Sequence, residues 1–372
     1  MDHTDFMLEA IHLAHRAKGK TAPNPTVGAV FVRDGEIIGK GYHKKAGTPH
    51  AEVLAARDAQ KQGYTIEGAT LYCTLEPCAH YGKTPPCADF LIQKKIQEVV
   101  IGMQDSFRLV NGGGLKKLKD AGIRVTVLPK TDALYKKIQL LNQPFLKWAT
   151  TGLPYVTMKA AVSLDGKIAT ATKQSQWITG ERARQDARRE RSMADAVLVG
   201  AGTVTDDDPE LLPHGAFRSK QLLRIIIDPT LSLPLSKKVF RDPHVLVATT
   251  ELAPKETKLL YEKNGIPVKS FGKKRVSIKQ LLQYLGKQEI QHVFIEGGAG
   301  VHGSFYDESL ADPLILDRVL WYVSPKIIGG VTALSAVGGE GIRTLKEAKP
   351  LTDVVLHHVG QDMKIEGYWN IY

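Results

Sequence analysis

Four side chains in the first half of this sequence have the types and spacing of a metal-dependent hydrolytic centre. His50 and Glu52 form an H-x-E pattern, and Cys78 and Cys87 follow it, each directly after a proline. One imidazole and two thiolates are preferred zinc ligands, and three protein ligands leave the fourth tetrahedral position to water. Zinc lowers the pKa of such a water to near neutrality. The pattern therefore predicts one catalytic zinc per chain, bound by His50, Cys78 and Cys87.

Glu52 stands two positions beyond the ligand His50, close enough to reach the zinc-bound water without coordinating the metal. A carboxylate in this place can take a proton from the water and pass it to a leaving amine. H-x-E followed by P-C is the signature of zinc-dependent base deaminases. We therefore predict that Glu52 is the catalytic acid and base of a hydrolytic deamination.

The chain has three cysteines, Cys73, Cys78 and Cys87, and all lie within fifteen positions. Such a cluster favours metal ligation in a reducing compartment over a disulfide framework. Cys73 ends an apolar run and is predicted to be a core residue. The alternatives for the other two are a closed zinc site with a fourth protein ligand, or buried cysteines without a metal.

The loop between the two predicted cysteine ligands is longer than in the usual signature. C-x-x-C is common, whereas eight residues separate Cys78 from Cys87. With this loop, the stretch from Glu76 to Cys87 resembles the deaminase half of the bifunctional riboflavin-biosynthesis deaminase/reductase family. The runs Asn24 to Gly28 and Gly41 to His43 are similar to that family too.

This resemblance implies that Asn24 and His43 hold a pyrimidine ring, and that His80 and Lys83 in the long loop contact the polar periphery of the substrate. The chain departs from the family in one loop. Where Asp-Pro-Asn-Pro is common, it has Asp105-Ser106-Phe107-Arg108, followed by Asn-Gly-Gly-Gly. The zinc ligands lie outside that loop.

Two glycine turns in the second half follow predicted strands. Residues 298–303 spell G-x-G-x-x-G, and residues 200–203 read Gly-Ala-Gly-Thr before the three aspartates 206–208. Backbone N–H groups in such turns can cradle phosphate, and two turns together could hold one dinucleotide. The motif alone does not establish a standard dinucleotide fold, because no acidic residue follows at the expected distance. We expect the aspartates to form a cap or solvated turn, and no second metal.

The second half resembles the reductase half of the same family through residues 163–167, 175–179, 200–203, 207–209 and 296–298. That half is similar in fold to dihydrofolate reductase and uses NADPH. The resemblance implies cofactor contacts from Ala161, Trp177, Thr203, Asp207, Gly298, Ala299, Gly300, Val301, His302, Gly303 and Ser304. It implies substrate contacts from Ser175, Arg191, Leu211 and Glu296. His214 stands where the family often has an arginine suited to the substrate phosphate, and Arg191 or Arg218 would supply that charge.

Alternating strand-like and helix-like apolar patterns along the chain predict an α/β fold. The strands and helices of this fold would position the candidate site residues. The patterns divide the chain at a Pro- and Gly-rich stretch into domains over 1–146 and 147–372. The resemblance implies that the N-terminal domain is a cytidine-deaminase-like three-layer domain and that the C-terminal domain is a dihydrofolate-reductase-like α/β domain. Predicted strands are 27–32, 37–42, 70–74, 99–101, 125–128, 156–161, 196–199, 224–227, 292–295 and 319–323. Predicted helices are 6–18, 51–62, 115–121, 133–141, 181–193 and one after Gly300.

Lysine and arginine outnumber aspartate and glutamate by 50 to 39, a net charge of +11, which favours anionic partners. A phosphorylated small-molecule substrate and NADPH account for this charge without nucleic acid. The sequence begins without a signal peptide and has no apolar run near the roughly 18 residues of a membrane span. We therefore expect a cytoplasmic protein without membrane contacts, and a homo-oligomer of unspecified size.

The resemblance implies that the two predicted sites catalyse two consecutive reactions in riboflavin biosynthesis. Zinc-bound hydroxide would deaminate 2,5-diamino-6-ribosylamino-4(3H)-pyrimidinone 5′-phosphate, and NADPH would then reduce the ribosyl group to ribityl. One alternative is a nucleic-acid base deaminase, which would bind oligonucleotides in a salt-sensitive way. Another is a non-enzymatic nucleotide-binding protein, in which a fourth protein ligand would close a structural zinc site.

Overall fold

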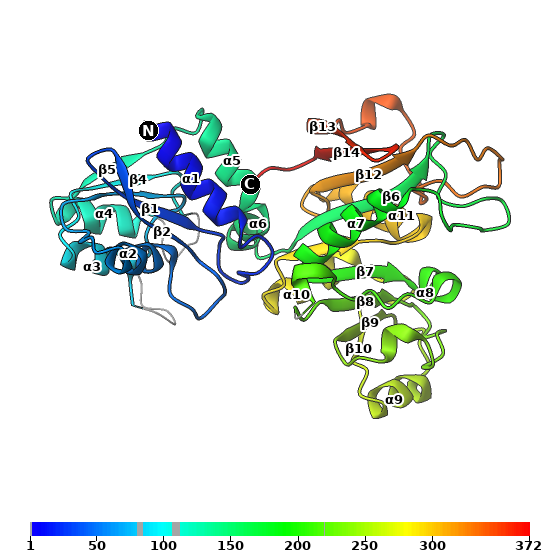
Figure 1. Cartoon of the computed structure of the whole chain (residues 1–372). Coiled ribbons are helices and arrows are strands. Elements are labelled where there is room, and N and C mark those ends of the chain that lie inside the picture. Colours follow the sequence, from blue (N-terminus) through cyan, green and yellow to red (C-terminus); the bar gives the residue numbers. More distant parts are fainter. Residues whose placement is uncertain (1, 80–84, 106–111, 219) are drawn as a thin grey trace. The chain divides into compact units, whose positions relative to one another are not determined.

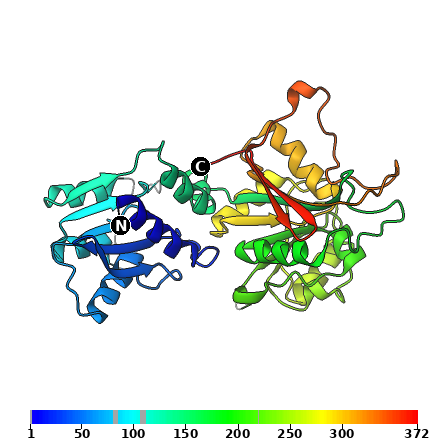
Figure 2. The ribbon, with the colours of Figure 1, turned by 45° about the horizontal axis from the view of Figure 1, so that its top comes forward.

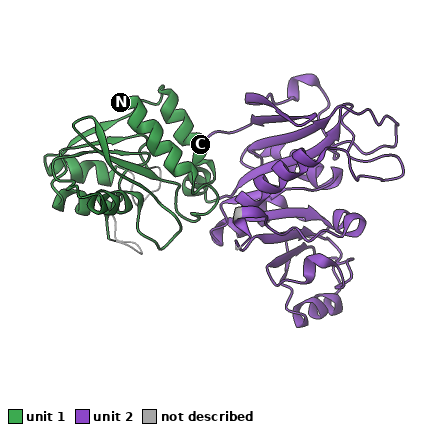
Figure 3. Cartoon of the chain, viewed as in Figure 1, with its two compact units in different colours: residues 1–152, 372 green, residues 153–371 purple. Residues whose placement is uncertain are grey.

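The computed structural model describes residues 2–79, 85–105, 112–218 and 220–372. The chain forms two compact units, residues 1–152 with Tyr372, and residues 153–371 (Figures 1 and 3). The predicted division at residue 147 falls within a helix of the first unit, Gln143–Thr151, which ends at Gly152 in the left-handed conformation. Each unit has its own sheet and its own hydrophobic cores.

Unit 1 is a five-stranded sheet in the order β2-β1-β3-β4-β5 between two layers of helices (Figure 1). Only β1 and β2, and β1 and β3, pair antiparallel among these strands. The strands are β1 Gly28–Arg33, β2 Glu36–Tyr42, β3 Thr70–Cys73, β4 Glu98–Ile101 and β5 Arg124–Val127. The helices are α1 His3–His15, α2 Ala51–Lys61, α3 Cys87–Gln93, α4 Gly113–Asp120, α5 Ala133–Leu141 and α6 Gln143–Thr151.

Alternating strand residues explain the three layers of unit 1. Ala29 and Phe31 of β1 pack in one core with α2, α3 and α4, whereas Val30 and Val32 pack in the other with α1, α5 and α6. Successive side chains of a strand point to opposite faces, so one sheet supports both cores. Cys73 is fully buried in the first core, which confirms its prediction as a core residue.

A close approach of α2 to β2 fixes the start of that helix. A Cβ atom at Gly41 would lie 2.3 Å from the backbone nitrogen of Ala55, so only glycine allows this contact. His50 is the extended N-cap residue of α2. The backbone of the sheet therefore determines where the imidazole of His50 and the carboxylate of Glu52 stand.

Unit 2 is a nine-stranded sheet in the order β10-β9-β8-β7-β11-β6-β12-β14-β13. It is parallel from β10 to β12, and β14 and β13 extend it as an antiparallel hairpin (Figure 2). The strands are β6 Tyr155–Ser163, β7 Ala196–Gly200, β8 Leu223–Ile227, β9 Val245–Thr249, β10 Val268–Ser270, β11 His292–Ile295, β12 Arg318–Ser324, β13 Thr352–Val359 and β14 Asp362–Tyr368. The helices are α7 Glu181–Met193, α8 Ala201–Asp207, α9 Lys255–Lys263, α10 Ile278–Lys287 and α11 Ala299–Ala311.

Helices cover both faces of this second sheet. Apolar side chains of α10 and α11 pack against one face, and those of α7, α8 and α9 pack against the other. Nearly continuous apolar strands such as Ala196–Gly200, in which every residue is buried, are typical of parallel sheets covered on both sides. No helix among the described residues is long and apolar enough to cross a membrane.

The predicted elements are present in both units, with shifts at their ends. The helix predicted over 6–18 is α1, which begins at His3 because Asp2 and Asp5 form a capping box at its start. The sequence analysis did not predict strands β9, β10, β13 and β14 or helices α3, α6, α8, α9 and α10. All of β13 up to its last residue is exposed, so its sequence lacks the alternation that marks a half-buried strand.

Candidate active sites

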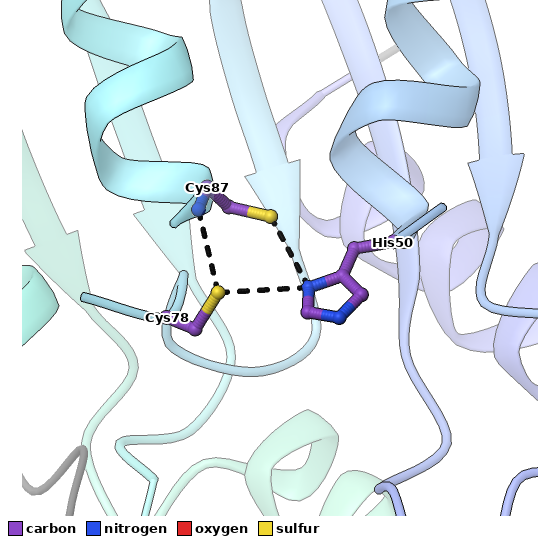
Figure 4. Close-up of side chains that lie close together, drawn as sticks. All are labelled: His50, Cys78 and Cys87. Carbon is purple, nitrogen blue, oxygen red and sulfur yellow. Dashed lines mark hydrogen bonds between the residues drawn. The ribbon is translucent and has the colours of Figure 1, made fainter. Parts of the chain in front are cut away.

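In unit 1, the three predicted zinc ligands converge on one point (Figure 4). Nδ1 of His50 lies 3.5 Å from Sγ of Cys78 and 3.3 Å from Sγ of Cys87. Tetrahedral zinc with ordinary Zn–S and Zn–N bonds places neighbouring ligand atoms about 3.5 Å apart. All three ligand atoms lie within 4.8 Å of one another. Their chemistry and spacing therefore fit zinc.

The two thiols of this cluster share a negative charge. A hydrogen bond from Cys87 lowers the pKa of Cys78, and the same contact together with burial raises the pKa of Cys87 well above its ordinary value. The backbone N–H of Cys87 also donates to Sγ of Cys78 at 3.3 Å. The hydrogen bond to Cys78 raises the pKa of His50. The pair thus offers one thiolate, beside the imidazole of His50, to a divalent cation.

Glu52 lies in the first turn of α2, next to this cluster. Its side chain is buried, and Oε2 has no hydrogen-bond partner among the described residues. Burial raises the pKa of Glu52, whereas the nearby imidazole of His50 opposes that rise. A buried carboxylate oxygen left unpaired is costly, and a water or substrate group in the pocket would relieve that cost.

Asn24 and His43, predicted to hold the pyrimidine, are brought together beside the cluster. Nδ2 of Asn24 lies 3.0 Å from Nε2 of His43, and the His43 and His50 rings meet edge to face at 5.2 Å. Burial lowers the pKa of His43, so its ring is neutral and Nε2 can accept from the amide. His80 and Lys83 lie outside the described residues, as do 106–111 of the atypical loop.

The sequence analysis did not identify the role of Glu76, which anchors the segment around Cys78 by hydrogen bonds. Its buried carboxylate accepts four backbone N–H groups, from Asp105 at 3.2 Å, Gly112 at 3.1 Å, Gly114 at 2.9 Å and Leu115 at 3.1 Å. These bonds tie the end of the β4 segment and the start of α4 to the ligand loop. In the sequence, this role is indicated only by the position of a glutamate two residues before a cysteine ligand. The backbone donors to Glu76 lie about thirty or more positions away.

In unit 2, the two glycine turns follow adjacent parallel strands. β7 and β11 pair directly, so the turns at 200–203 and 296–298 leave the same edge of the sheet. Ligands of open α/β sheets bind at the carboxyl ends of the strands. A Cβ atom at Gly202 would meet nothing within 4 Å, and one at Gly298 only Oγ1 of Thr203 at 3.9 Å. Both glycines face open space that a ligand can fill.

A cavity of about 830 Å³ opens at this edge and is large enough for a dinucleotide and a substrate. It is lined by ten of the residues predicted for the reductase site, Ala161, Ser175, Trp177, Arg191, Thr203, Asp207, Leu211, Glu296, Gly298 and His302. The other predicted residues, Ala299, Gly300, Val301, Gly303 and Ser304, belong to α11. Gly303 has a packing role, because a Cβ there would lie 2.4 Å from the backbone of Gly338.

Trp177 presents one open face to the cavity. It is 58% exposed, and the guanidinium of Arg184 lies 4.4 Å from the centre of its ring. Asp207 fixes the neighbouring chain, accepting from Oγ of Ser175 at 3.2 Å and Nε2 of Gln176 at 3.0 Å. The second indole face is therefore available to a planar ring. Nothing in the sequence pattern indicated Arg184.

Arg191 and Glu296, both predicted to face the substrate, form an ion pair of 3.2 Å across the cavity wall. Arg191 also donates to the backbone oxygen of Leu212 at 3.3 Å. Leu211, next to it, has a positive φ of 56°. His214 lines the same cavity, and its backbone N–H donates to Oγ of Ser192 at 2.9 Å.

His302 is a buried polar residue of this wall. Its Nδ1–H donates to the backbone oxygen of Ala336 at 2.8 Å, whereas Nε2 has no partner among the described residues. Burial lowers the pKa of His302 to about 4. The ring is therefore neutral, with Nε2 as an acceptor, and it stacks on Trp321 at 6.1 Å.

Comparisons with known proteins agree with both units. The cytidine and deoxycytidylate deaminase zinc-binding region matches residues 1–103, and the RibD C-terminal domain matches residues 154–365. The riboflavin biosynthesis protein RibD of Bacillus amyloliquefaciens is 42% identical over 97% of this chain and 94% of its own. That of Aquifex aeolicus is 41% identical over 97% of both chains.

Solved structures give the same result for the whole chain. Acinetobacter baumannii RibD, form 1, has a TM-score of 0.85, with 37% identity over 98% of both chains. A Thermotoga maritima diaminohydroxyphosphoribosylaminopyrimidine deaminase/5-amino-6-(5-phosphoribosylamino)uracil reductase has a TM-score of 0.82, with 34% identity over 98% of this chain and 97% of its own. The predicted fold class and the two predicted cofactors, zinc and NADPH, are thereby confirmed. The chain belongs to the RibD family of riboflavin-biosynthesis enzymes, which are bifunctional deaminases and reductases.

Proposed function

We propose that unit 1 deaminates 2,5-diamino-6-ribosylamino-4(3H)-pyrimidinone 5′-phosphate and that unit 2 reduces the ribosyl group of the product to ribityl. The observation that carries this proposal is the His50, Cys78 and Cys87 cluster beside the unpaired Oε2 of Glu52. A three-ligand site next to a carboxylate with one unpaired oxygen suits hydrolysis rather than a structural metal. We further propose that the enzyme acts in the cytoplasm as a homo-oligomer.

In the deaminase site, zinc bound by His50, Cys78 and Cys87 would supply the activation of a water near neutral pH. Oε2 of Glu52 accepts the proton that this water loses and delivers it to the departing amino group, which leaves as ammonia. The amide of Asn24, bonded to Nε2 of His43, orients the pyrimidine. Burial of Glu52 excludes bulk water from the proton transfer.

In the reductase site, NADPH would supply the hydride for C1 of the ribosyl group. Trp177 offers its open indole face to a planar ring of the cofactor, and Asp207 holds the chain beside it. The backbone at Gly202 and Gly298 leaves room for the cofactor phosphates. Glu296 and Arg191 hold each other in place against the substrate side of the cavity.

The test is a coupled assay on the whole chain with the diamino-ribosylamino-pyrimidinone phosphate as substrate. We expect about one zinc per chain, ammonia release without NADPH, and NADPH oxidation only after deamination. Ammonia release without any NADPH oxidation would contradict the reductase assignment. A zinc-loaded chain that releases no ammonia would contradict the proposed substrate.

A further inference from the structure

Glu76, just after β3, joins two other segments of unit 1 by hydrogen bonds. Its side chain is buried. The donors are four backbone N–H groups, those of Asp105 and Gly112 on Oε2 and those of Gly114 and Leu115 on Oε1. A carboxylate has about four acceptor positions on its two oxygens, so these bonds occupy the whole group. Hydrogen bonds to an ionised acceptor are stronger than neutral ones.

The carboxylate of Glu76 caps helix α4 from outside that helix. The first N–H groups of a helix have no partner within it, and a negative charge at that end is favourable. The N-cap residue of α4 is Gly112, which has no side chain to supply an acceptor. Gly114 and Leu115 lie in the first turn and donate to Glu76 instead. Glu76 therefore fixes the start of α4.

The same helix start packs against the peptide that leads from Glu76 to the zinc ligand Cys78. A Cβ atom at Gly114 would lie 2.0 Å from the backbone oxygen of Pro77, so only glycine allows this approach. The ring of Pro77 fixes its φ, which leaves few conformations to the link between Glu76 and Cys78. The start of α4 therefore determines where the backbone of Cys78 lies.

The other two zinc ligands are held by other elements. Cys87 is the first residue of α3, and its N–H donates to Sγ of Cys78 (Figure 4). His50 is the N-cap residue of α2. Among the described residues, the group that could hold a metal contains these three ligands and not Glu76. Glu76 can therefore act on the metal only through the position of Cys78.

We propose that Glu76 is a positioning residue that raises the zinc affinity of unit 1 by holding Cys78 in the geometry of the bound metal. A site whose ligands already stand in place loses less conformational freedom on binding. Loss of a residue that orients a metal ligand typically costs about 10- to 100-fold in metal affinity. Because His50 and Glu52 are positioned by α2, proton transfer at a fully loaded site does not depend on Glu76.

The first test compares Glu76→Gln with Glu67→Gln in the whole chain. Both variants exchange a carboxylate of unit 1 for an amide, but the Glu67 side chain is 60% exposed. The amide nitrogen of glutamine cannot accept hydrogen bonds, so Glu76→Gln leaves backbone donors without an acceptor. Competition with a chromophoric chelator measures zinc affinity without any substrate. We expect a fall of about 10- to 100-fold in Glu76→Gln and none in Glu67→Gln.

The second test leaves Glu76 intact and disturbs the contact between α4 and Pro77. Gly114→Ala places a Cβ against the backbone oxygen of Pro77, whereas a Cβ at Gly113 meets only the Cβ of Ala79 at 3.5 Å, an ordinary contact. Alanine favours a helix over glycine at both positions, so helix propensity cannot explain a difference. We expect zinc affinity to fall in Gly114→Ala and to be kept in Gly113→Ala.

Cobalt substitution separates positioning from unfolding, because Co²⁺ absorbs visible light according to its ligand geometry, whereas d¹⁰ zinc does not. We expect Glu76→Gln to reach the wild-type cobalt spectrum at a higher metal concentration. At saturating zinc, its ammonia release should equal that of the wild type.

Four results would overturn the inference. The first is wild-type zinc affinity in Glu76→Gln, and the second is an equal loss in Gly113→Ala and Gly114→Ala. The third is an altered cobalt spectrum at saturation, because the ligand set itself would then have changed. The fourth is ammonia release that stays low in zinc-saturated Glu76→Gln, because Glu76 would then act in the reaction itself.

Discussion

The two active sites differ in how many residues form them and in how far apart those residues lie. In unit 1, three ligand atoms within 4.8 Å and one buried carboxylate form the reactive centre. In unit 2, a cavity of about 830 Å³ takes its lining from strands, helices and loops spread over residues 159–334. The affinity of a metal centre depends on each of its few ligands, whereas the affinity of a cleft for its cofactor is the sum of many weak contacts. Single substitutions should therefore abolish the first activity and only tune the second.

The largest effect is expected from removal of a metal ligand. Cys87→Ser should lower zinc affinity by more than about 100-fold, the effect already seen for the partners of ligands, and deaminase activity should be lost with the metal. Zinc content and ammonia release measure this, and NADPH oxidation with deaminated substrate should persist. Cys73→Ala, which removes the cysteine of the core, should keep its zinc. Equal zinc loss in both variants would contradict the assigned ligands.

The next effect concerns the carboxylate beside the cluster. Glu52→Gln should keep one zinc per chain but slow ammonia release by about 10²- to 10⁴-fold, because the amide cannot carry the proton. Reduction of the deaminated substrate serves as the internal control for folding. Glu67→Gln, at an exposed position of unit 1, should retain full deaminase activity. Normal ammonia release by Glu52→Gln would remove Glu52 from the mechanism.

Unit 2 should respond more mildly to the loss of a single large contact. Trp177→Ala should raise the KM for NADPH by about tenfold, since aromatic stacking contributes about 0.5–1.5 kcal/mol beyond buried area. Steady-state kinetics and quenching of protein fluorescence by NADPH measure the change. Trp148→Phe, in unit 1, is the control. An increase confined to the KM of the pyrimidine substrate would place Trp177 at the substrate instead of the cofactor.

The smallest expected effect comes from the buried histidine of unit 2. The folded pKa of His302 is about 4, below its unfolded value of 6.5, so the unfolded state binds more protons between these values. Its stabilisation is thus complete above pH 6.5 and is lost as the pH falls toward 4. At pH 6 the loss should be below about 1 kcal/mol.

Urea unfolding at pH 7.5 and pH 6 should therefore show a larger fall in unfolding free energy for the wild type than for His302→Gln. A direct NMR titration of the His302 ring gives the folded pKa itself. A ring that titrates near 6.5 would show that His302 is not buried as described. His43, whose pKa burial also lowers, provides the corresponding comparison in unit 1.

The sequence could predict most of the fold because its signals are local. Helix α7 and strand β11 have the predicted bounds of 181–193 and 292–295, since periodicity and burial coincide there. The exposed β13, with no alternation, could not be recognised. Its pairing with β14 depends on backbone hydrogen bonds, which leave little trace in side-chain type.

For the sites, the sequence by itself determined which residue types could do chemistry: the H-x-E pair, the two proline–cysteine steps and the two glycine turns. Only the tertiary structure decided which of those groups are engaged. Glu76 finds its backbone donors about thirty or more positions away, and Arg191 finds Glu296 105 positions away. A sequence motif consists of residues that are close together in the chain. The hydrogen-bond and ion-pair partners of a side chain come from distant parts of the chain, so they are decided only when the chain folds.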